Sequence, residues 1–174
     1  MQQKEAIHLI KNDYIIQPAP QIWADLGCGT GTFTLALASL LHEESVIYAV
    51  DKDETSLRKI PEFYNEINIQ KINTDFTKED FPFTDPDGVL MANALHFVKN
   101  KMDFIYKFNT YLKADACWLI VEYETNQANP WVPYPIRYHE LEKLFKDAGY
   151  NYVTKLREAP SRYHGSMYAA LIKT

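Results

Sequence analysis

The sequence predicts a single α/β domain whose mostly parallel sheet is covered by helices on both faces. Two observations support this prediction. Apolar segments of strand length alternate with segments of helical pattern along the 174 residues, and several apolar segments end beside glycine, aspartate or asparagine. Strand–helix alternation is typical of three-layer sheets. Such sheets bind ligands at the carboxyl ends of their strands, so these polar residues should gather at one edge.

The first predicted elements surround a glycine-rich loop. Apolar residues at helical spacing predict a helix over residues 4–15. A buried strand is expected at 21–26. After the glycines, residues 32–43 predict a helix buried on most of its surface. Residues 45–51 then predict a second strand with an aspartate at its end.

The middle of the chain continues the alternation. Residues 54–67 have a helical pattern that Pro61 interrupts. The shorter segment 67–75 predicts a third, alternating strand. The continuous apolar segment 87–95 predicts a fourth strand, buried on both faces. Apolar residues at helical spacing then predict a helix over 101–113.

The last third of the chain predicts three strands and one helix. Residues 116–124 predict the fifth strand. Residues 138–150 form an amphipathic helical pattern, with Gly149 as a stop signal. Segments 151–159 and 166–174 are expected to be two closing strands around a turn.

Composition and charge disfavour several classes of protein. Cys28 and Cys117 form neither a disulfide framework nor a metal-ligand spacing. No segment approaches the roughly 18 apolar residues of a membrane span, and the charged start is unlike a secretory signal. The formal net charge of −5 disfavours sequence-independent binding to nucleic acid. We therefore expect a cytoplasmic protein without a metal site, a nucleic-acid partner or a membrane partner.

The most informative segment is ADLGCGTGTFT, which places Gly27, Gly29 and Gly31 at alternate positions. Thr32 stands where the dinucleotide-binding pattern has its third glycine, and no Gly-Lys-Ser/Thr of a phosphate-binding loop follows. Asp25 precedes the loop, which suits a cationic ligand better than a pyrophosphate. A tight strand-to-helix turn without a ligand is the simpler alternative.

Four segments in this order, DLGCGTG, VIYAVD, NTDF and GVLMANALHFV, resemble those of the class I S-adenosylmethionine-dependent methyltransferases. The resemblance runs from about Trp23 to the end. It implies a three-layer, doubly wound, Rossmann-like methyltransferase fold of seven strands in the order 3-2-1-4-5-7-6, with strand seven antiparallel. We expect one domain over residues 1–174, with an N-terminal helix and lead-in segment at 1–20 and a core at 21–174.

The resemblance also implies which residues bind S-adenosylmethionine. The loop backbone would contact the methionine and ribose, Asp25 the ammonium, Asp51 both ribose hydroxyls and Asp75 the adenine amino group. The expected cofactor-binding set is Asp25, Gly27, Cys28, Gly29, Gly31, Asp51, Lys52, Asp75, Phe76 and Asn93. Structural roles remain as alternatives: a helix cap for Asp51, a turn cap for Asp75 and a core position for Phe76.

The acceptor side of the site is less defined by the sequence. A general base is needed only where the acceptor loses a proton. His96, after the fourth strand, is the candidate catalytic residue, and a plain turn position is its alternative. Aromatic and arginine residues near the expected edge are the substrate candidates: Tyr14, Tyr123, Trp131, Tyr134, Arg137, Tyr138 and Arg162. Their alternative role is to cover the core.

The function that we expect is methyl transfer from S-adenosylmethionine to a small-molecule acceptor. The fourth strand ends in Asn93-Ala94-Leu95-His96. This departs from the Asn-Pro-Pro-Tyr of related enzymes that methylate adenine amines or glutamine amides. Two alternatives stay open: a non-catalytic cofactor-binding module, and aminopropyl transfer from the decarboxylated cofactor. The small size also leaves open a homodimer whose second subunit completes the acceptor site.

Overall fold

The computed structural model describes residues 1–161 and 165–174. Within these residues eight strands form one sheet: β1 (Ile22–Leu26), β2 (Val46–Asp51), β3 (Phe63–Tyr64), β4 (Ile67–Asn73), β5 (Gly88–Ala92), β6 (Cys117–Tyr123), β7 (Tyr152–Pro160) and β8 (Ser166–Lys173). The helices that accompany them are α1 (Gln3–Ile10), α2 (Thr32–Ala38), α3 (Glu54–Leu57), the short 3-10 helix η1 (Leu95–Phe97), α4 (Lys101–Asn109) and α5 (Tyr138–Asp147).

The strand order is β3-β4-β2-β1-β5-β6-β8-β7. Strand β8 runs antiparallel to both β6 and β7, whereas β4, β2, β1, β5 and β6 are mutually parallel. Without β3, this is the expected order 3-2-1-4-5-7-6 with an antiparallel seventh strand. The predicted fold class is therefore confirmed, and the strand count is corrected from seven to eight among the described residues.

The additional strand replaces part of the helix expected over residues 54–67, so that prediction is wrong beyond Glu54–Leu57. Pro61 has no amide hydrogen to continue a helix. Asn65 and Glu66 both have positive φ, 47° and 63°, and they join β3 to the antiparallel β4. Positive φ at both central residues is the turn geometry that suits a two-residue hairpin. Helices α1, α2 and α4 also end earlier than their sequence patterns predict.

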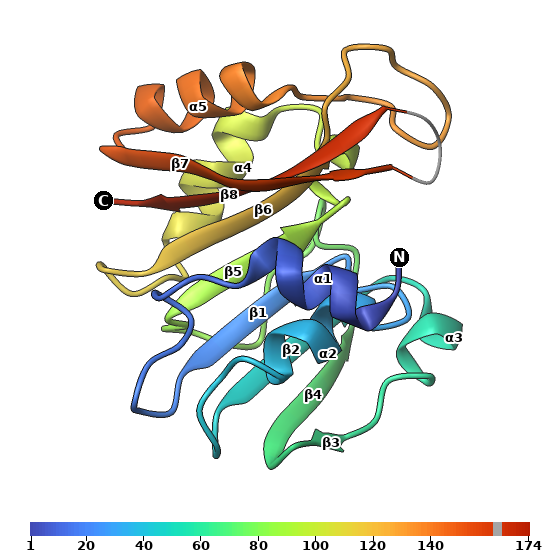
Figure 1. Cartoon of the computed structure of the whole chain (residues 1–174), viewed down its shortest axis with the longest axis vertical. Coiled ribbons are helices and arrows are strands. Elements are labelled where there is room, and N and C mark those ends of the chain that lie inside the picture. The colour runs from blue at the N-terminus through green and yellow to red at the C-terminus, as the bar shows by residue number, and fades with distance from the viewer. Residues whose placement is uncertain (162–164) are drawn as a thin grey trace.

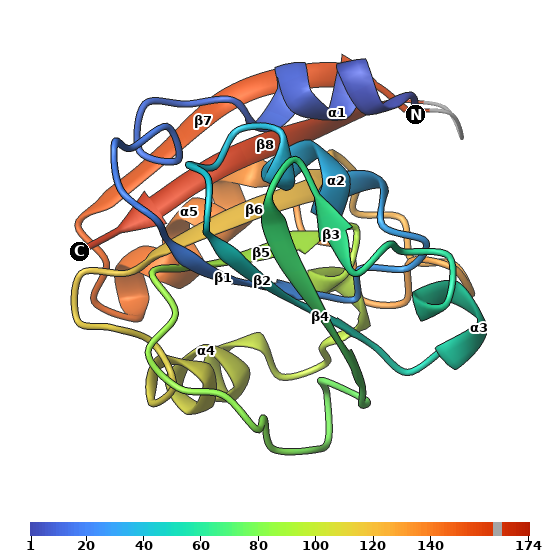
Figure 2. The same ribbon diagram turned by 90° about the horizontal axis from the view of Figure 1, so that it is seen from below.

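Helices cover both faces of the sheet, as Figure 2 shows: α1 and α2 lie on one side, and α4 and α5 on the other. Each face has its own apolar core. Leu9 of α1 and Leu37 of α2 are buried on the first face. Phe108 of α4 and Phe145 of α5 are buried on the second, where both rings pack edge-on against Trp118 of β6. The sheet is thus held in place from both sides.

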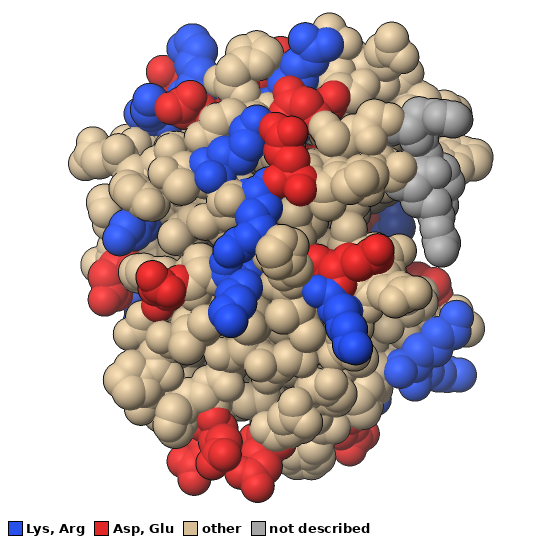
Figure 3. Space-filling model, viewed as in Figure 1, with Lys and Arg blue, Asp and Glu red and all other residues tan. Residues whose placement is uncertain are grey.

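The fold brings the carboxyl ends of the central strands to one edge, at the right of Figure 1, where the N-terminus also lies. Leu26 of β1 pairs with Val50 of β2, and Ala92 of β5 pairs with Val121 of β6. The loops after these strands therefore leave the sheet side by side. On the face that Figure 3 shows, side chains of both charges are interspersed. None of the helices in the described part of the chain has the length and apolar character needed to cross a bilayer.

Candidate functional site

The glycine loop joins β1 to α2 in a backbone conformation that favours glycine. The φ angles are 73° at Gly27, 53° at Gly29 and 86° at Gly31. A Cβ on Gly27 would lie 2.8 Å from the Cβ of Ala94, so this glycine also permits close packing. A Cβ on Gly29 would meet no described atom within 4 Å. The open side of Gly29 therefore leaves room for a ligand against the backbone.

Asp25 is a buried carboxylate below this loop, with an exposed fraction of 1%. Its Oδ2 accepts a hydrogen bond from the Thr34 hydroxyl at 2.6 Å, and its Oδ1 has no partner among the described residues. Burial raises the pKa of Asp25 to about 7; the nearby Asp51 adds to the rise, and the Thr34 hydrogen bond opposes it. A buried acceptor without a partner is costly, so Oδ1 is suited to a ligand that donates hydrogen bonds.

A cavity of about 250 Å³ adjoins Asp25, and its walls include Gly27, Gly29, Met1 and Asn93. Asn93 has a left-handed φ of 54°, and its amide side-chain oxygen Oδ1 is buried without a partner in the described chain. Two of the residues that line the cavity thus carry a buried, unpaired oxygen, and Gly29 adds an open backbone. This donor-poor lining fits a ligand with a cationic, hydrogen-bonding group.

Asp51, at the end of β2, is tied to the glycine loop. Its Oδ2 accepts a hydrogen bond from the Gly29 amide, and its Oδ1 accepts one from the Asp53 amide, each at 2.8 Å. A carboxylate has about four acceptor positions, so both oxygens keep capacity for a diol. The two backbone contacts fix the orientation of the carboxylate beside the loop.

Three other predicted cofactor residues lie outside the walls of this cavity. The Asp75 carboxylate caps a turn: it accepts hydrogen bonds from the amide and hydroxyl of Thr77 and pairs with Lys78 at 3.0 Å. Phe76 packs beside Gly27 and edge-on against a ring of α4. Lys52 is exposed. Their adenine-binding roles stay predictions.

Cys28 lies in the glycine loop, and the contact of its backbone with the cofactor stays a prediction. Its amide donates to the Val50 carbonyl at 3.1 Å, and its side chain lies in the core. Burial raises the pKa of the Cys28 thiol well above its usual range. The thiol is therefore not a nucleophile at neutral pH.

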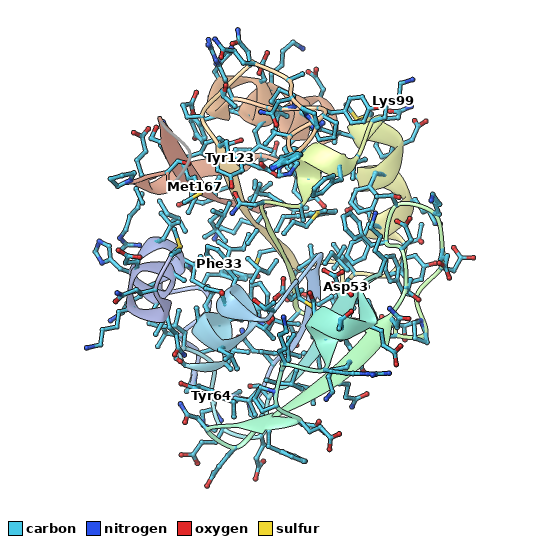
Figure 4. The ribbon with its side chains drawn as sticks, turned by 90° about the vertical axis from the view of Figure 1, so that its right-hand side faces the viewer. Phe33, Asp53, Tyr64, Lys99, Tyr123 and Met167 are labelled. Carbon is cyan, nitrogen blue, oxygen red and sulfur yellow. The ribbon has the colours of Figure 1, made fainter. Side chains whose placement is uncertain are left out.

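Among the described residues, Asn93 lines the Asp25 cavity and also two larger cavities. One, of about 930 Å³, lies between α1 and the ends of β7 and β8. Figure 4 shows Phe33, Tyr123 and Met167, which line it, on either side of the space between the two halves of the molecule. The other, of about 590 Å³, lies under the loop that follows β6. Because both include Asn93 and Tyr123 in their walls, an acceptor in either would adjoin the Asp25 cavity.

His96 lines the 590 Å³ cavity and forms a buried pair with Glu122. Their exposed fractions are 2% and 1%. His96 Nδ1 lies 2.8 Å from Glu122 Oε2, and the His96 amide donates to Glu122 Oε1 at 3.0 Å. Strands β5 and β6 are neighbours, and η1 follows β5 directly, so the sheet register sets this pairing.

The structure brings three of the predicted substrate residues together with His96. Tyr123, Trp131 and Arg137 all line the 590 Å³ cavity. Trp131 is 70% exposed, so its ring stands at the cavity mouth rather than in the core. The loop after β6 thus lines this cavity, and the substrate roles of its residues stay predictions.

The other predicted substrate residues lie elsewhere. Tyr138 packs edge-on against Tyr168 within the second core, and Tyr134 lines a shallow hollow beside α4. The Tyr14 hydroxyl donates to the Asp115 carbonyl at 2.6 Å, near the amino ends of the strands, at the edge opposite the glycine loop. Placing Tyr14 in the pocket is therefore a prediction that we correct. Arg162 lies outside the described residues.

Sequence reasoning missed several residues of the site. Met1, Phe33 and Met167 line cavities only because α1, α2 and β8 meet at one edge. Thr34 carries no sequence signal for its bond to Asp25. Glu122 does carry one, because an acid within the otherwise apolar strand CWLIVEY needs a buried partner.

A doubly wound sheet of this order, with a glycine-rich loop after its first strand and an acid at the end of the next, defines a class I methyltransferase. The sequence agrees: residues 24–115 match the family model described as "Methyltransferase domain". The chain therefore belongs to this family of S-adenosylmethionine-dependent methyltransferases. No curated protein matches the chain by sequence.

Solved structures resemble this fold at low sequence identity. The 1,6-didemethyltoxoflavin-N1-methyltransferase of Burkholderia thailandensis, with 1,6-didemethyltoxoflavin and S-adenosylhomocysteine bound, has a TM-score of 0.72 and 18% identity, over 99% of this chain and 77% of that one. A SAM-dependent methyltransferase of Aquifex aeolicus has a TM-score of 0.63 and 17% identity, over 99% of each chain. Magnesium protoporphyrin IX methyltransferase of Synechocystis, with SAM bound, has a TM-score of 0.67 and 13% identity, over 99% and 79%. At these low identities, the TM-scores show that the fold is similar and no more.

Proposed function

We propose that this chain binds S-adenosylmethionine at the glycine loop and transfers its methyl group to a small-molecule acceptor in the 590 Å³ cavity. The observation that carries the proposal is the buried Oδ1 of Asp25, which has no partner among the described residues and belongs to a residue that lines the cavity beside Gly29. The ammonium of the cofactor supplies the hydrogen-bond donors that this oxygen lacks. When bound, the cofactor supplies a methyl group that its sulfonium activates.

The chain's own residues would orient the cofactor and exclude water. Asp25 holds the ammonium, and the preset Asp51 carboxylate accepts from the ribose hydroxyls. Asp75 and Phe76 are proposed to lie beside the adenine. Asp75 would then accept a hydrogen bond from the adenine in addition to those from Thr77. Asn93, whose buried side-chain oxygen has no partner among the described residues, would form the floor under the sulfonium. Fixed positioning of this kind is the main contribution that a protein makes to a displacement reaction.

The acceptor is proposed to be small because the cavity that adjoins Asn93 has a limited volume. Its volume of about 590 Å³ is within the range of small-molecule sites. A fold neighbour is solved with the small heterocycle 1,6-didemethyltoxoflavin bound. Aminopropyl transfer to a polyamine would favour an acidic acceptor groove, and Arg137 in the cavity wall disfavours a cationic acceptor.

Calorimetric titration tests the cofactor assignment. The wild-type protein should bind S-adenosylmethionine and S-adenosylhomocysteine but not NAD. Asp51→Ala should weaken both by roughly 1.5–3 kcal/mol, the value of hydrogen bonds to a charged group, or about 10–150-fold in Kd. Asp147→Ala is the matched control, because Asp147 is a surface acid of α5 that pairs with Lys143 away from the glycine loop. Equal affinities for wild type and Asp51→Ala would overturn the placement of the ribose. A binding-only module would show the same affinities but no methyl transfer to any acceptor.

A further inference from the structure

The proposed function does not yet use Glu122, the buried partner of the cavity-lining residue His96. The Glu122 carboxylate accepts three hydrogen bonds: from His96 Nδ1, from the His96 amide and, at 3.3 Å, from the Tyr123 amide. Two backbone amides donate to this carboxylate, so its oxygens act as acceptors. We therefore assign the hydrogen of the contact between Glu122 and His96 to Nδ1. This fixes the imidazole tautomer and leaves Nε2 with a free lone pair.

The Nε2 atom of His96 is available to a ligand. His96 lines the 590 Å³ cavity, and Nε2 forms no hydrogen bond with any residue in the described ranges. The imidazole ring is held between the rings of Phe97 and Tyr123, with centroids 4.4 Å and 5.9 Å away. The orientation of the ring is thus restrained by two aromatic neighbours and by its contact with the Glu122 carboxylate.

The loop over His96 is anchored rather than free. The Tyr134 amide donates to the His96 carbonyl at 3.0 Å. Lys101 Nζ donates to the carbonyls of Tyr134 and Val98, at 2.8 Å and 2.9 Å. These contacts hold the loop, with Trp131 at its tip, across the cavity that contains Nε2. The cavity is therefore preformed for an acceptor.

The other walls of the cavity indicate the kind of molecule that it fits. Trp131 and Phe97 are partly exposed aromatic rings in its lining, and they offer flat apolar surfaces. Arg137 lines the same cavity and makes no ion pair within residues 1–161 and 165–174. A guanidinium pairs best with a carboxylate or phosphate. A planar ring with an anionic substituent matches these features.

We propose that Glu122 is a positioning residue that holds His96 as a general base, and that the acceptor is an aromatic hydroxy acid. Its ring lies against Trp131 and Phe97, its carboxylate pairs with Arg137, and its hydroxyl faces Nε2. This inference rests on the proposed function, and it assigns a substrate class to the same site.

The step is balanced without a further reagent. The acceptor hydroxyl gives its proton to His96 Nε2, and its oxygen forms a bond to the methyl carbon. The bond from that carbon to sulfur breaks, and the sulfur keeps the electron pair as a neutral thioether. Glu122 stabilises the imidazolium that results, because Nδ1 already donates to its carboxylate.

A chromogenic acceptor analogue tests the inference without turnover. We would load the protein with S-adenosylhomocysteine and titrate it with 4-hydroxy-3-nitrobenzoate, whose absorption spectrum reports ionisation of its phenol. At one fixed pH below the midpoint of the free probe, the bound probe should be more ionised than the free probe. The methyl ester of the probe, which lacks the carboxylate, should bind more weakly.

Two substitutions separate the roles of the residues. Glu122→Gln should abolish the additional ionisation while the probe still binds, and Glu122→Asp should restore part of it. With a methyl-accepting hydroxybenzoate, Glu122→Gln should also lower kcat by about 10²–10⁴-fold, the usual contribution of a general base. Arg137→Gln should weaken binding of the acid at least tenfold and leave binding of the ester unchanged. Glu142→Gln and Arg58→Gln are matched controls, because both residues form surface ion pairs away from the cavity.

The outcomes distinguish this inference from the proposed function. If the protein does not bind S-adenosylhomocysteine, both are wrong. If it binds the cofactor but the probe is no more ionised than in buffer, the base assignment is wrong and the cofactor site stands. Equal affinities for acid and ester would overturn the substrate class. Glu122→Gln changes a buried acid, so the thermal unfolding and the cofactor affinity of this variant are measured before the probe titration. If that variant does not fold, Glu122→Asp and His96→Gln decide the base assignment.

Discussion

Two buried carboxylates, Asp25 and Glu122, lie on opposite sides of Asn93, and their hydrogen bonding differs. Both have an exposed fraction of 1%. Asp25 has one partner, the Thr34 hydroxyl, and leaves Oδ1 unpaired among the described residues. Glu122 has both oxygens paired, with the ring and amide of His96. One acid is incomplete without a ligand, and the other is completed by its own chain.

This difference indicates separate roles for the Asp25 side and the Glu122 side of the site. A buried acceptor without a partner is unfavourable in free energy, and a donor on a ligand removes that penalty. The Asp25 side is therefore suited to binding the cofactor. A carboxylate with all its partners in place orients what it touches, so the Glu122 side is built to hold His96. The comparison predicts that substitutions on the two sides separate cofactor affinity from turnover.

The largest expected effect is on turnover. His96→Gln should lower the rate of methyl transfer by about 10²–10⁴-fold, because a base no longer removes the acceptor proton. The Kd for S-adenosylmethionine, measured by calorimetry, should not change. His42→Gln is the matched control, since His42 lies in the loop between α2 and β2. A parallel loss of cofactor affinity in His96→Gln would show that the two sides are not separate.

Asp25→Asn should give the opposite pattern. The amide keeps the shape of the side chain but loses the charge that faces the ammonium. We expect the affinity for S-adenosylmethionine to fall by roughly 1.5–3 kcal/mol, measured by calorimetry. Ionisation of the bound nitrophenol probe at saturating S-adenosylhomocysteine should be unchanged. A loss of probe ionisation in Asp25→Asn would remove the distinction between the two acids.

Most of the fold was predictable because its patterns are local. Alternating strands and helices over 174 residues predict the layers, and the resemblance supplies the strand order. The segment after residue 57 is the exception. Its apolar residues have helical spacing, but Pro61 ends the helix and the positive φ of Asn65 and Glu66 turns the chain into β3–β4. Spacing does not report such backbone conformations.

The candidate site was predictable on one side only, for a similar reason. Asp25 and the glycines are contiguous in sequence, so one short segment contains most of the cofactor loop. His96 and Glu122 are 26 positions apart and meet through the pairing of β5 with β6. Tyr14 follows α1, and the path of the chain after α1 takes it to the far edge. Contacts that depend on strand pairing or on the course of a connecting segment cannot be recognised from a short stretch of sequence.

A smaller effect is expected on stability. Thr34→Val removes the hydrogen bond to Asp25 Oδ2 and leaves the buried carboxylate without its partner. The free energy of unfolding should fall by roughly 1–3 kcal/mol, measured by urea denaturation at neutral pH. Saturating S-adenosylmethionine should recover part of this loss by pairing Oδ1. Thr110→Val is the control, because the Thr110 hydroxyl is exposed and bonds only a helix-end carbonyl. If the two variants lose equal stability, the Asp25–Thr34 bond has no special weight.

A further expected effect is a change of stability with pH that depends on Asp25. Burial raises the pKa of Asp25 from 3.8 to about 7 in the folded chain, so the folded state holds a proton that the unfolded state has lost. Its contribution should therefore decrease the free energy of unfolding as pH rises from about 4 to 7, by at most about 1.4 kcal/mol per pH unit.

The same proton should be released when the cofactor binds. An ammonium at Oδ1 favours the ionised carboxylate, so at pH 7 binding should release about half a proton from Asp25. Calorimetry in buffers of different ionisation enthalpy measures this release, and Asp25→Asn corrects for the cofactor's own amino group. An equal proton release by wild type and Asp25→Asn would mean that the ammonium does not reach Asp25. In that case the unpaired oxygen of Asp25 would be a property of the buried core and not of the binding site, and the contrast with Glu122 would lose its functional meaning.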